Sequence, residues 1–282
     1  MLERCNITGF ADEIDSKFDV QLEVLGELGQ KYIELRAADG IGVADVSMEK
    51  ASELKNKMQE QNIRVSAIGS PIGKIGIGDD FESHFEKYKH IVELAQYFET
   101  PYIRMFSFYL PKEDKPEKYQ KQVFDRIEKL VEYAARKKVT LLHENEKGIY
   151  GELAPECQQL LERFYGDHFQ GIFDFANFVQ CGQDTKEAYD RLKSYIAYIH
   201  VKDAVRGTGE VVLPGQGDGN LSYIFSKLEE RNFDGFLSLE PHLFHFAGLD
   251  QLEKAPGAKK ESNGVAAYKA AHLYLKKLID KR

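Results

Sequence analysis

Eight short apolar runs, spread along the whole sequence, place the strongest constraint on how this chain can fold. Each run has four to six residues and is rich in Ile, Val, Phe, Tyr or Leu, which is typical of parallel strands buried on both faces. We expect strands at residues 5–9, 32–36, 64–69, 102–106, 140–144, 170–173, 196–200 and 236–239.

Longer amphipathic stretches separate these runs and predict helices. The stretch that starts at Ser47, for example, begins with a residue suited to cap a helix and keeps Ala51, Leu54 and Met58 on one stripe. We expect helices at residues 47–61, 81–98, 116–137, 154–165, 185–192, 221–231 and 265–279. Strands that alternate with helices predict a parallel sheet, and eight is the number that closes into a TIM (β/α)8 barrel. The predicted fold class is therefore α/β.

One barrel accounts for the length of the chain. A barrel of this kind typically has about 250 residues, so we expect residues 1–282 to form a single TIM-barrel domain. The polar stretch at residues 249–264, which contains Gly and Pro, predicts a loop over the barrel mouth. An open, dinucleotide-binding sheet usually has a glycine-rich turn after its first strand, and residues 9–13 lack that G-x-G-x-x-G pattern.

Charge and composition disfavour several classes of protein. A net charge of −8 argues against a nucleic-acid partner, because an acidic surface repels phosphates. No apolar run approaches the roughly 18 residues that span a bilayer, and the N-terminus lacks the apolar segment of a signal peptide. The widely spaced Cys5, Cys157 and Cys181 indicate free thiols rather than disulfides or a thiolate zinc site. We therefore expect a cytoplasmic protein with no nucleic-acid or membrane partner.

Four successive strands, the fifth to the eighth, end in side chains that can bind a metal ion. These side chains are Glu144, Asp174, His200 and Glu240, and the chemistry of such barrels lies at the C-terminal ends of the strands. Neighbouring strands are roughly 4.8 Å apart, so four adjacent ends can converge on one ion. Carboxylate and imidazole ligands without thiolates favour one divalent metal ion, either Mn, Mg, Co or Zn.

Several short segments carry a resemblance to a known family. They are Gly-Phe-Ala-Asp at 9–12, Ile-Glu-Leu at 33–35, Glu-Asn at 144–145, Asp174, His-Val-Lys-Asp at 200–203 and Leu-Glu at 239–240. With these segments the chain resembles, over essentially its whole length, the xylose-isomerase-like TIM-barrel superfamily of sugar isomerases and epimerases. The resemblance implies that Glu144, Asp174, His200 and Glu240 hold the divalent ion. It also implies that Glu144 and Glu240 form the catalytic acid/base pair.

Further polar residues are predicted to bind the substrate: Lys202, Arg206, Arg36, Asn177 and His242. Lys202 shares its strand parity with His200, and His242 shares its parity with Glu240, so both pairs point the same way. Arg206 matches an arginine of ketose 3-epimerases, whereas Asn177 stands where those enzymes have a histidine. Glu34 is expected to be the internal partner of Arg36. Residues 215–219 are rich in glycine and predict either a phosphate cradle or a flexible turn.

The predicted reaction is proton transfer next to a carbonyl through an enediolate, in an isomerase or epimerase of a sugar, sugar phosphate or cyclitol. The same groups would serve a metal-dependent dehydratase (a lyase) of the inosose or dehydroshikimate type if a β-hydroxyl left instead. A non-catalytic sugar-binding barrel is a third alternative, and the intact glutamate pair argues against it. A nuclease like endonuclease IV needs extra histidine ligands on the second and third strands, which here end in Arg36-Ala37 and Gly69-Ser70. A small sugar or cyclitol is thus the expected partner, and the resemblance is compatible with a homo-oligomer.

Overall fold

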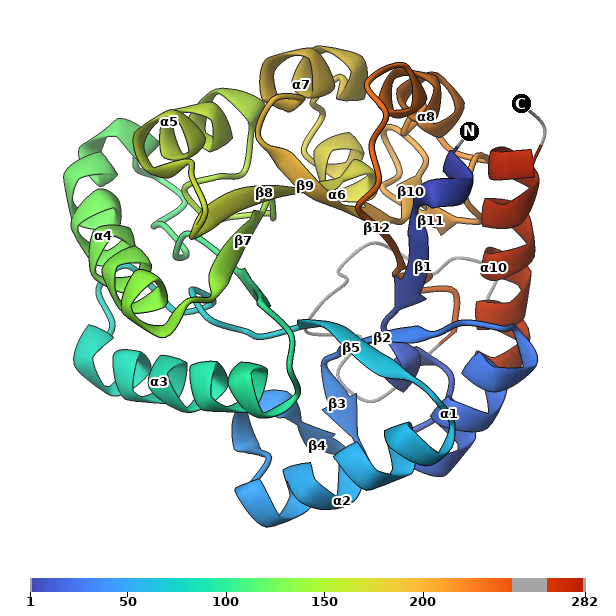
Figure 1. Ribbon diagram of the computed structural model, residues 1–282. Helices are drawn as coiled ribbons and strands as arrows, with labels where there is room; N and C mark the ends of the chain where they lie inside the picture. The colour runs from blue at the N-terminus through green and yellow to red at the C-terminus, as the bar shows by residue number, and fades with distance from the viewer. Residues whose placement is uncertain (1, 245–262, 281–282) are drawn as a thin grey trace.

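Eight parallel strands form a nearly closed barrel in the computed structural model, which describes residues 2–244 and 263–280 (Figure 1). The strands are β1 (Asn6–Gly9), β2 (Tyr32–Leu35), β5 (Arg64–Ile68), β6 (Tyr102–Met105), β7 (Thr140–Glu144), β8 (Phe169–Asp174), β9 (Ile196–Val201) and β12 (Phe236–Leu239). Their order is β1-β12-β9-β8-β7-β6-β5-β2, and the two end strands β1 and β2 lie against each other. The predicted TIM (β/α)8 barrel is confirmed, and the expected strands differ from the observed ones by one residue at most at either end.

Helices surround the strands, as Figure 1 shows in a view along the barrel. They are α1 (Phe18–Glu27), α2 (Met48–Glu60), α3 (Phe81–Tyr97), α4 (Gln120–Lys137), α5 (Ala154–Phe164), α6 (Phe175–Gln180), α7 (Thr185–Leu192), α8 (Leu221–Glu230) and α10 (Gly264–Asp280). All seven predicted helices are present. The prediction omitted α1, although Phe18, Leu22 and Leu25 recur at helical spacing on its buried face. It also omitted the short α6, in which Phe175 to Val179 are all buried, so no polar face reveals a helical period.

The described residues also form two short hairpins and four 3₁₀ turns outside the barrel strands. The hairpins pair β3 (Ala37–Ala38) with β4 (Ile41–Gly42), and β10 (Asp203–Ala204) with β11 (Val211–Val212). The 3₁₀ turns are η1 (Leu2–Arg4), η2 (Ala11–Glu13), η3 (Val43–Asp45) and η4 (Pro116–Lys118). The loop expected at residues 249–264 lies outside the described residues, apart from its last two positions. Of these elements, η2 and the β10–β11 hairpin contribute directly to the surroundings of the candidate site.

Polar side chains fill part of the barrel interior beneath the strand ends. Ser66 of β5 bonds both Thr8 of β1, at 2.8 Å between their hydroxyl oxygens, and Tyr198 of β9, at 2.9 Å. All three side chains are buried. The ring of Tyr198 lies 5.8 Å from that of His200, two residues further along the same strand. Strand alternation thus places the side chain of His200 on the inward face of the barrel, directly above the buried side chains of Thr8, Ser66 and Tyr198.

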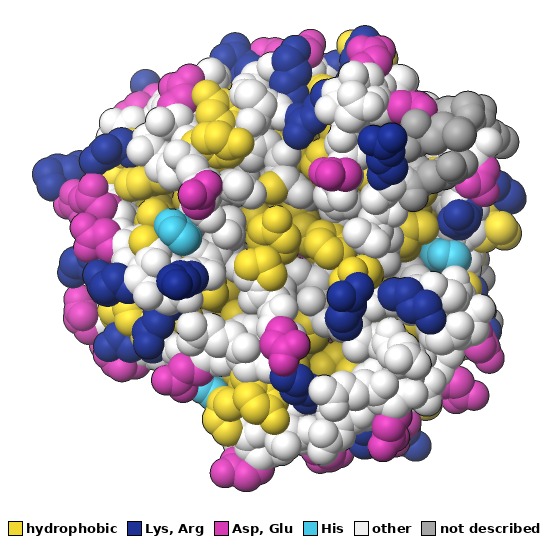
Figure 2. Space-filling view, in the orientation of Figure 1, with side chains coloured by type: hydrophobic (Ala, Val, Ile, Leu, Met, Phe, Trp, Pro, Cys, Tyr) yellow, Lys and Arg dark blue, Asp and Glu magenta, His cyan; other side chains and the backbone are white. Residues whose placement is uncertain are grey.

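The surface in view carries charges of both signs. Figure 2 shows Lys and Arg side chains interspersed with Asp and Glu around the rim, with hydrophobic side chains near the centre of that face. On this face, the positive and negative side chains are mixed rather than gathered into one patch. None of the helices in the described part of the chain combines the length and the apolar character that a membrane span requires.

The loop after β5 depends on a buried neutral histidine. The backbone N–H of Gly73 donates to Nε2 of His84 at 2.8 Å, and burial lowers the pKa of His84 to about 4. The unfolded chain binds a proton here near pH 6.5 and the folded chain does not, so the free energy of unfolding should fall as the pH drops from 6.5 towards 4. We expect His84→Gln to reduce the slope of the free energy of unfolding against pH, by an amount equivalent to at most one bound proton. Urea unfolding at several pH values measures it, and an unchanged slope would refute the assignment.

Candidate metal centre

Four buried side chains converge at the C-terminal end of the barrel. Glu144 ends β7, Asp174 ends β8, His200 is the penultimate residue of β9, and Glu240 directly follows β12. Asp174 and His200 are paired residues on adjacent strands. One ligand atom from each of the four residues lies within 4.8 Å of the others. We call these four residues the metal cluster. They are the four ligands that the sequence predicts, and the barrel does bring them together.

The two glutamates of the metal cluster each have their own cationic partners. Arg104 donates to Oε2 of Glu144 at 3.2 Å, while Nδ1 of His200 lies 2.9 Å from Oε1. Burial alone raises the pKa of Glu144, but His200 and Arg104 outweigh it and lower the pKa to about 2. Burial likewise raises the pKa of Glu240, and Lys202 and His242 hold it well below the usual range. Both carboxylates are therefore ionised at neutral pH.

Asp174 is in a different electrostatic situation. Its Oδ1 accepts the backbone N–H of Asn177 at 2.7 Å and so caps α6, whereas its buried Oδ2 makes no hydrogen bond. Nζ of Lys202 lies 3.3 Å from that oxygen, which is an ion pair without hydrogen-bond geometry. Burial, helped by the charges of Glu240 and Glu144, raises the pKa of Asp174 to about 7 despite Lys202. A buried oxygen that lacks a donor is the feature that a cation at this position would satisfy.

His200 lies between two carboxylates. Its Nδ1 faces Glu144 and lies 3.5 Å from Oε2 of Glu240, while its Nε2 lies 3.1 Å from Oε2 of Glu34. Ser238 donates to the same oxygen of Glu34 at 2.6 Å. Burial lowers the pKa of His200, but Glu144 and Glu34 raise it well above the usual range. The prediction that Glu34 is the internal partner of Arg36 is therefore wrong: Glu34 points across the barrel to His200.

Arg36 instead belongs to a network beside Glu240. It donates to Asp12 at 2.9 Å, to Glu13 at 3.2 Å and to Glu240 at 3.3 Å. Nε2 of His242 lies 3.1 Å from the same Oε1 of Glu240, and the backbone N–H of His242 donates to Glu13. The structure thus places Arg36, His242 and Lys202 next to Glu240, where the sequence predicts substrate-binding groups. Whether they contact substrate stays a prediction.

Phe10 supports both arginines that orient the glutamates. The guanidinium carbons of Arg36 and Arg104 lie over its ring, 4.2 and 4.7 Å from the centroid, and its edge meets His200 at 5.2 Å between ring centroids. Gly69 packs against the ring so closely that a Cβ there would lie 2.6 Å from it. Arg104 also donates to the carbonyl oxygens of Gly69 and Ser70, so it anchors the loop after β5 as well as Glu144.

The sequence prediction gave no site role to Phe10, Asp12 or Glu13, although Phe10 and Asp12 lie in the segment 9–12 that carries the family resemblance. All three follow the first strand at its C-terminal end, so the strand-end criterion applied to the fifth to eighth strands would also have selected them. Glu34 gave no such signal, because its partner His200 is 166 residues away in the chain.

The other two predicted substrate-binding residues differ in position, since Asn177 lies against the metal cluster and Arg206 lies away from it. The side chain of Asn177 is buried and donates to the carbonyl oxygen of Asn145 at 2.9 Å and to Glu144 at 3.5 Å, so it supports the metal cluster from α6. Arg206 is on the turn of the β10–β11 hairpin, where its side chain is 47% exposed and lies 3.8 Å from Asp184. His143 faces away from the cluster, as strand parity predicts, with its ring against Phe169.

The glycine-rich segment at residues 215–219 already holds an anion, which is the carboxylate of Asp203. Oδ2 of Asp203 accepts the backbone N–H groups of Gly215 and Gly217, and Oδ1 accepts those of Gly219 and Ala204, all at 2.9 Å. A Cβ at Gly217 or Gly219 would lie 2.6 or 2.7 Å from Oδ1. The segment is therefore neither a free phosphate cradle nor a flexible turn, the two alternatives that the sequence left open. It is a loop held in place by a carboxylate of the protein itself.

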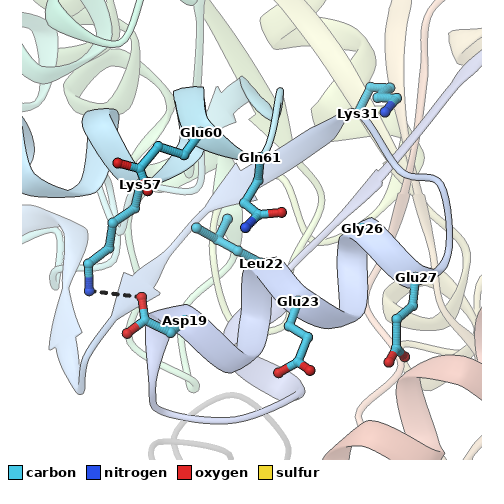
Figure 3. Close-up of a pocket in the computed structure, with 9 residues that line it drawn as sticks. All are labelled: Asp19, Leu22, Glu23, Gly26, Glu27, Lys31, Lys57, Glu60 and Gln61. Carbon is cyan, nitrogen blue, oxygen red and sulfur yellow. Dashed lines mark ion pairs between the residues drawn. The ribbon is translucent and has the colours of Figure 1, made fainter.

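A separate groove of about 710 Å³ lies on the outer surface between α1 and α2 (Figure 3). It is lined by Asp19, Leu22, Glu23, Gly26, Glu27, Lys31, Lys57, Glu60 and Gln61. Within it, Lys57 pairs with Asp19 at 2.8 Å. Its lining shares no residue with the metal cluster, and it lies on helices rather than at strand ends. The groove is therefore not part of the candidate site.

The fold and the buried acid–histidine cluster together define a TIM barrel with a candidate divalent-metal centre at the C-terminal ends of its strands. The chain belongs to the xylose isomerase-like TIM barrel family, whose model matches residues 22–273. This family membership confirms the resemblance found in the sequence.

Curated relatives and solved structures include both dehydratases and epimerases. By sequence the chain is 22% identical to 3-dehydroshikimate dehydratase of Bacillus anthracis over 71% of this chain and 70% of that protein. It is 23% identical to inosose dehydratase of Clostridium perfringens, but over only 43% of this chain and 46% of that protein. Among solved structures, an IolI protein with a bound zinc atom superposes with a TM-score of 0.77 at 17% identity, covering 98% of both chains. D-psicose 3-epimerase of Clostridium cellulolyticum gives 0.74 at 13% identity, also covering 98% of both chains. At these identities the structures show a shared fold.

Proposed function

We propose that this protein is a divalent-metal-dependent isomerase or epimerase that moves a proton next to the carbonyl of a sugar or cyclitol. The observation that supports this proposal is the pair Glu144 and Glu240 in one buried cluster. Cationic side chains keep each carboxylate ionised and therefore free to accept a proton. Two bases approaching one substrate from different strands suit a reaction that removes a proton from a carbon and returns one to it.

The residues of the metal cluster fit a divalent ion. Ligands about 2.0–2.3 Å from an ion are at most about 4.6 Å apart, which is compatible with four ligand atoms inside 4.8 Å of one another. The unsatisfied Oδ2 of Asp174 offers a further reason for a cation there. The zinc atom in the IolI structure supports the same proposal. Glu144, Asp174, His200 and Glu240 would hold the ion, and when bound it would supply Lewis-acid stabilisation of negative charge on the substrate oxygens.

The proposed proton transfers use residues of this chain. Glu144 removes the proton from the carbon next to the carbonyl, and the electron pair of the broken C–H bond delocalises onto the carbonyl oxygen. Glu240, ionised at rest, takes a proton from His242, whose pKa is raised by Glu13 and Glu240 in spite of burial, and passes it to the carbon as the electron pair returns from the oxygen to form the new C–H bond. The proton on Glu144 is then released to water, and His242 is reprotonated from water. Arg104 and Asn177 position Glu144, while Arg36 positions Glu240. Lys202, at 3.4 Å from Glu240, is proposed to donate to a substrate oxygen.

A dehydratase is the second candidate, and a specific observation favours it. The two kinds of curated protein that match by sequence, from Bacillus anthracis and Clostridium perfringens, are both dehydratases. The same first proton transfer to Glu144 would start elimination. A leaving hydroxyl group then needs a proton donor, and Lys202 and His242 are buried cations beside Glu240 that suit this role.

Proton nuclear magnetic resonance in D₂O distinguishes these candidates. The purified protein, loaded with Mn²⁺ and then freed of excess metal, is incubated with a panel of ketoses, inososes and 3-dehydroshikimate, each with a metal-free control. Deuterium at the carbon next to the carbonyl, with every hydroxyl group retained, supports an isomerase or epimerase. Loss of water with formation of a new carbon–carbon double bond, which from 3-dehydroshikimate gives an aromatic ring, supports the dehydratase. Metal-loaded protein that catalyses neither reaction across the panel would refute the proposal.

Glu34 provides a test of the metal site that does not depend on turnover. A carboxylate that accepts the free N–H of a metal-binding histidine fixes the ring and its tautomer, and losing it typically costs about 10–100-fold in metal affinity. We expect Glu34→Gln to weaken Mn²⁺ binding by about this factor, and Ser238→Ala, which retains the carboxylate, to weaken it less. Competition with a chelating dye measures both affinities. An unchanged affinity in Glu34→Gln would contradict the role of His200 as a ligand.

A further inference from the structure

The described Arg, Lys and His side chains that flank Glu144 and Glu240 from outside the metal cluster each already face a carboxylate of the protein; they are Arg36, Arg104, Lys202 and His242. From this we infer that the substrate is an uncharged polyhydroxy compound, and that phosphate esters and carboxylic acids are poor substrates. The inference rests on the proposed function and narrows its substrate class. It separates neutral ketoses and inososes from sugar phosphates and from acids such as dehydroshikimate.

The cations on the Glu240 side of the cluster are shared among several acids. The guanidinium of Arg36 contacts Asp12, Glu13 and Glu240 at 2.9–3.3 Å. The Nζ of Lys202 lies 3.3 Å from Asp174 and 3.4 Å from Glu240. An incoming anion would have to compete with these buried carboxylates for the same two cations.

The cations on the Glu144 side are also paired. Arg104 donates to Glu144 and to two backbone carbonyl oxygens. Lys74, on the loop after β5, forms an ion pair with Glu146 at 2.9 Å. Both residues of this pair are largely buried, with side chains 13% and 11% exposed. On both sides of the cluster, therefore, the positive charges already face carboxylates of the protein.

The backbone offers no free alternative in the segment where barrels often bind phosphate. The four N–H groups of Ala204, Gly215, Gly217 and Gly219 all donate to Asp203, as described above. The Asp203 carboxylate is buried, so a phosphate group could use these donors only by displacing it. Displacement would leave a buried carboxylate unpaired, which typically costs several kcal/mol.

Hydroxyl groups meet no such barrier. Each hydroxyl both donates and accepts, so it can bond to Glu13 or Glu146 while those residues keep their ion pairs. An anionic group placed among Asp12, Glu13 and Glu240 would instead face like charges. The existing arrangement of paired charges thus suits a neutral polyol and penalises an anion.

Substrate pairs that differ only in a phosphate group test the inference. Metal-loaded full-length protein is given D-ribulose and D-ribulose 5-phosphate, then D-fructose and D-fructose 6-phosphate, and kcat/KM for deuterium exchange next to the carbonyl is measured. Binding of xylitol and xylitol 5-phosphate is measured in parallel by calorimetry. We expect the neutral member of a pair to be favoured by about 100-fold or more, because an anionic group would face the carboxylates of Asp12, Glu13 and Glu240. Its kcat/KM should not change between low and 0.3 M NaCl, because no charge steers its approach.

The outcomes separate this inference from the proposed function. Preference for the neutral member, in exchange or in binding, supports the inference. Equal or better exchange or binding with a phosphorylated member overturns it, and exchange in that case leaves the proposed function standing. Absence of both exchange and binding across all pairs counts against the proposed function and against this inference with it.

Discussion

Glutamine in place of Glu144 or Glu240 is expected to reduce turnover of the true substrate by about 10³-fold, within the range that general acid–base groups contribute. Glutamine has nearly the same shape and keeps one oxygen that can bind a metal, but it cannot accept a proton from carbon. We therefore expect the bound metal, measured by elemental analysis, to fall much less than the turnover. This difference distinguishes loss of a base from loss of the ion.

The stereochemistry of exchange sharpens this test. If the two glutamates act from opposite sides of the substrate, each substitution should abolish deuterium exchange from one epimer more strongly than from the other. Glu93→Gln makes the same chemical change on the exposed face of α3 and serves as the control. Either variant of the metal cluster that keeps wild-type turnover with bound metal would rule out the two-base mechanism.

Asp203→Ala is expected to destabilise the folded protein by roughly 3–5 kcal/mol, among the largest effects of a single substitution outside the cluster. Its carboxylate accepts four backbone N–H groups, and hydrogen bonds to charged acceptors are each worth about 1.5–3 kcal/mol. Without it, Gly215, Gly217 and Gly219 lose the acceptor around which the loop is built. Urea denaturation of the wild type and the variant measures the difference.

Two comparisons make the interpretation of Asp203→Ala specific. Asp218→Ala, on the same loop, removes an acceptor for only the backbone N–H of Arg206 at an exposed position, and we expect less than about 1 kcal/mol. Formate or phosphate should restore part of the stability of Asp203→Ala, because either anion can occupy the vacated donors. If Asp203→Ala unfolds at the same urea concentration as Asp218→Ala, the proposed role of this carboxylate is wrong.

The barrel was predictable because its signals are local. Short apolar runs and amphipathic stretches each report on their own segment, and their alternation allows few architectures. The strand ends were equally accessible: Glu144, Asp174, His200 and Glu240 occupy the last position of a strand or the position next to it. Since adjacent parallel strands are about 4.8 Å apart, placement along the chain was enough to predict their convergence.

The partners of these residues were not predictable in the same way. Glu34 has the strand position expected from the sequence, yet it pairs with His200 rather than with Arg36. Arg36 reaches Glu240, 204 residues away in the chain, together with Glu13 from η2. These contacts cross between strands and turns, and they depend on side-chain torsions and packing that no local pattern encodes. Similarly, the match of Arg206 to an arginine of ketose 3-epimerases did not predict the β10–β11 hairpin, which directs the Arg206 side chain towards Asp184.

Local sequence patterns are enough to predict the barrel, its strands and the four metal-capable residues at the ends of the fifth to eighth strands. Periodicity and strand spacing are properties of the backbone, so they can be read from the order of residues alone. The contact of Glu34 with His200, the packing of both arginines on Phe10 and the binding of Asp203 by the glycine-rich loop become visible only in the folded barrel. These outcomes follow from competition among buried charges for a few donors in a closed space, and that space exists only after the barrel has formed.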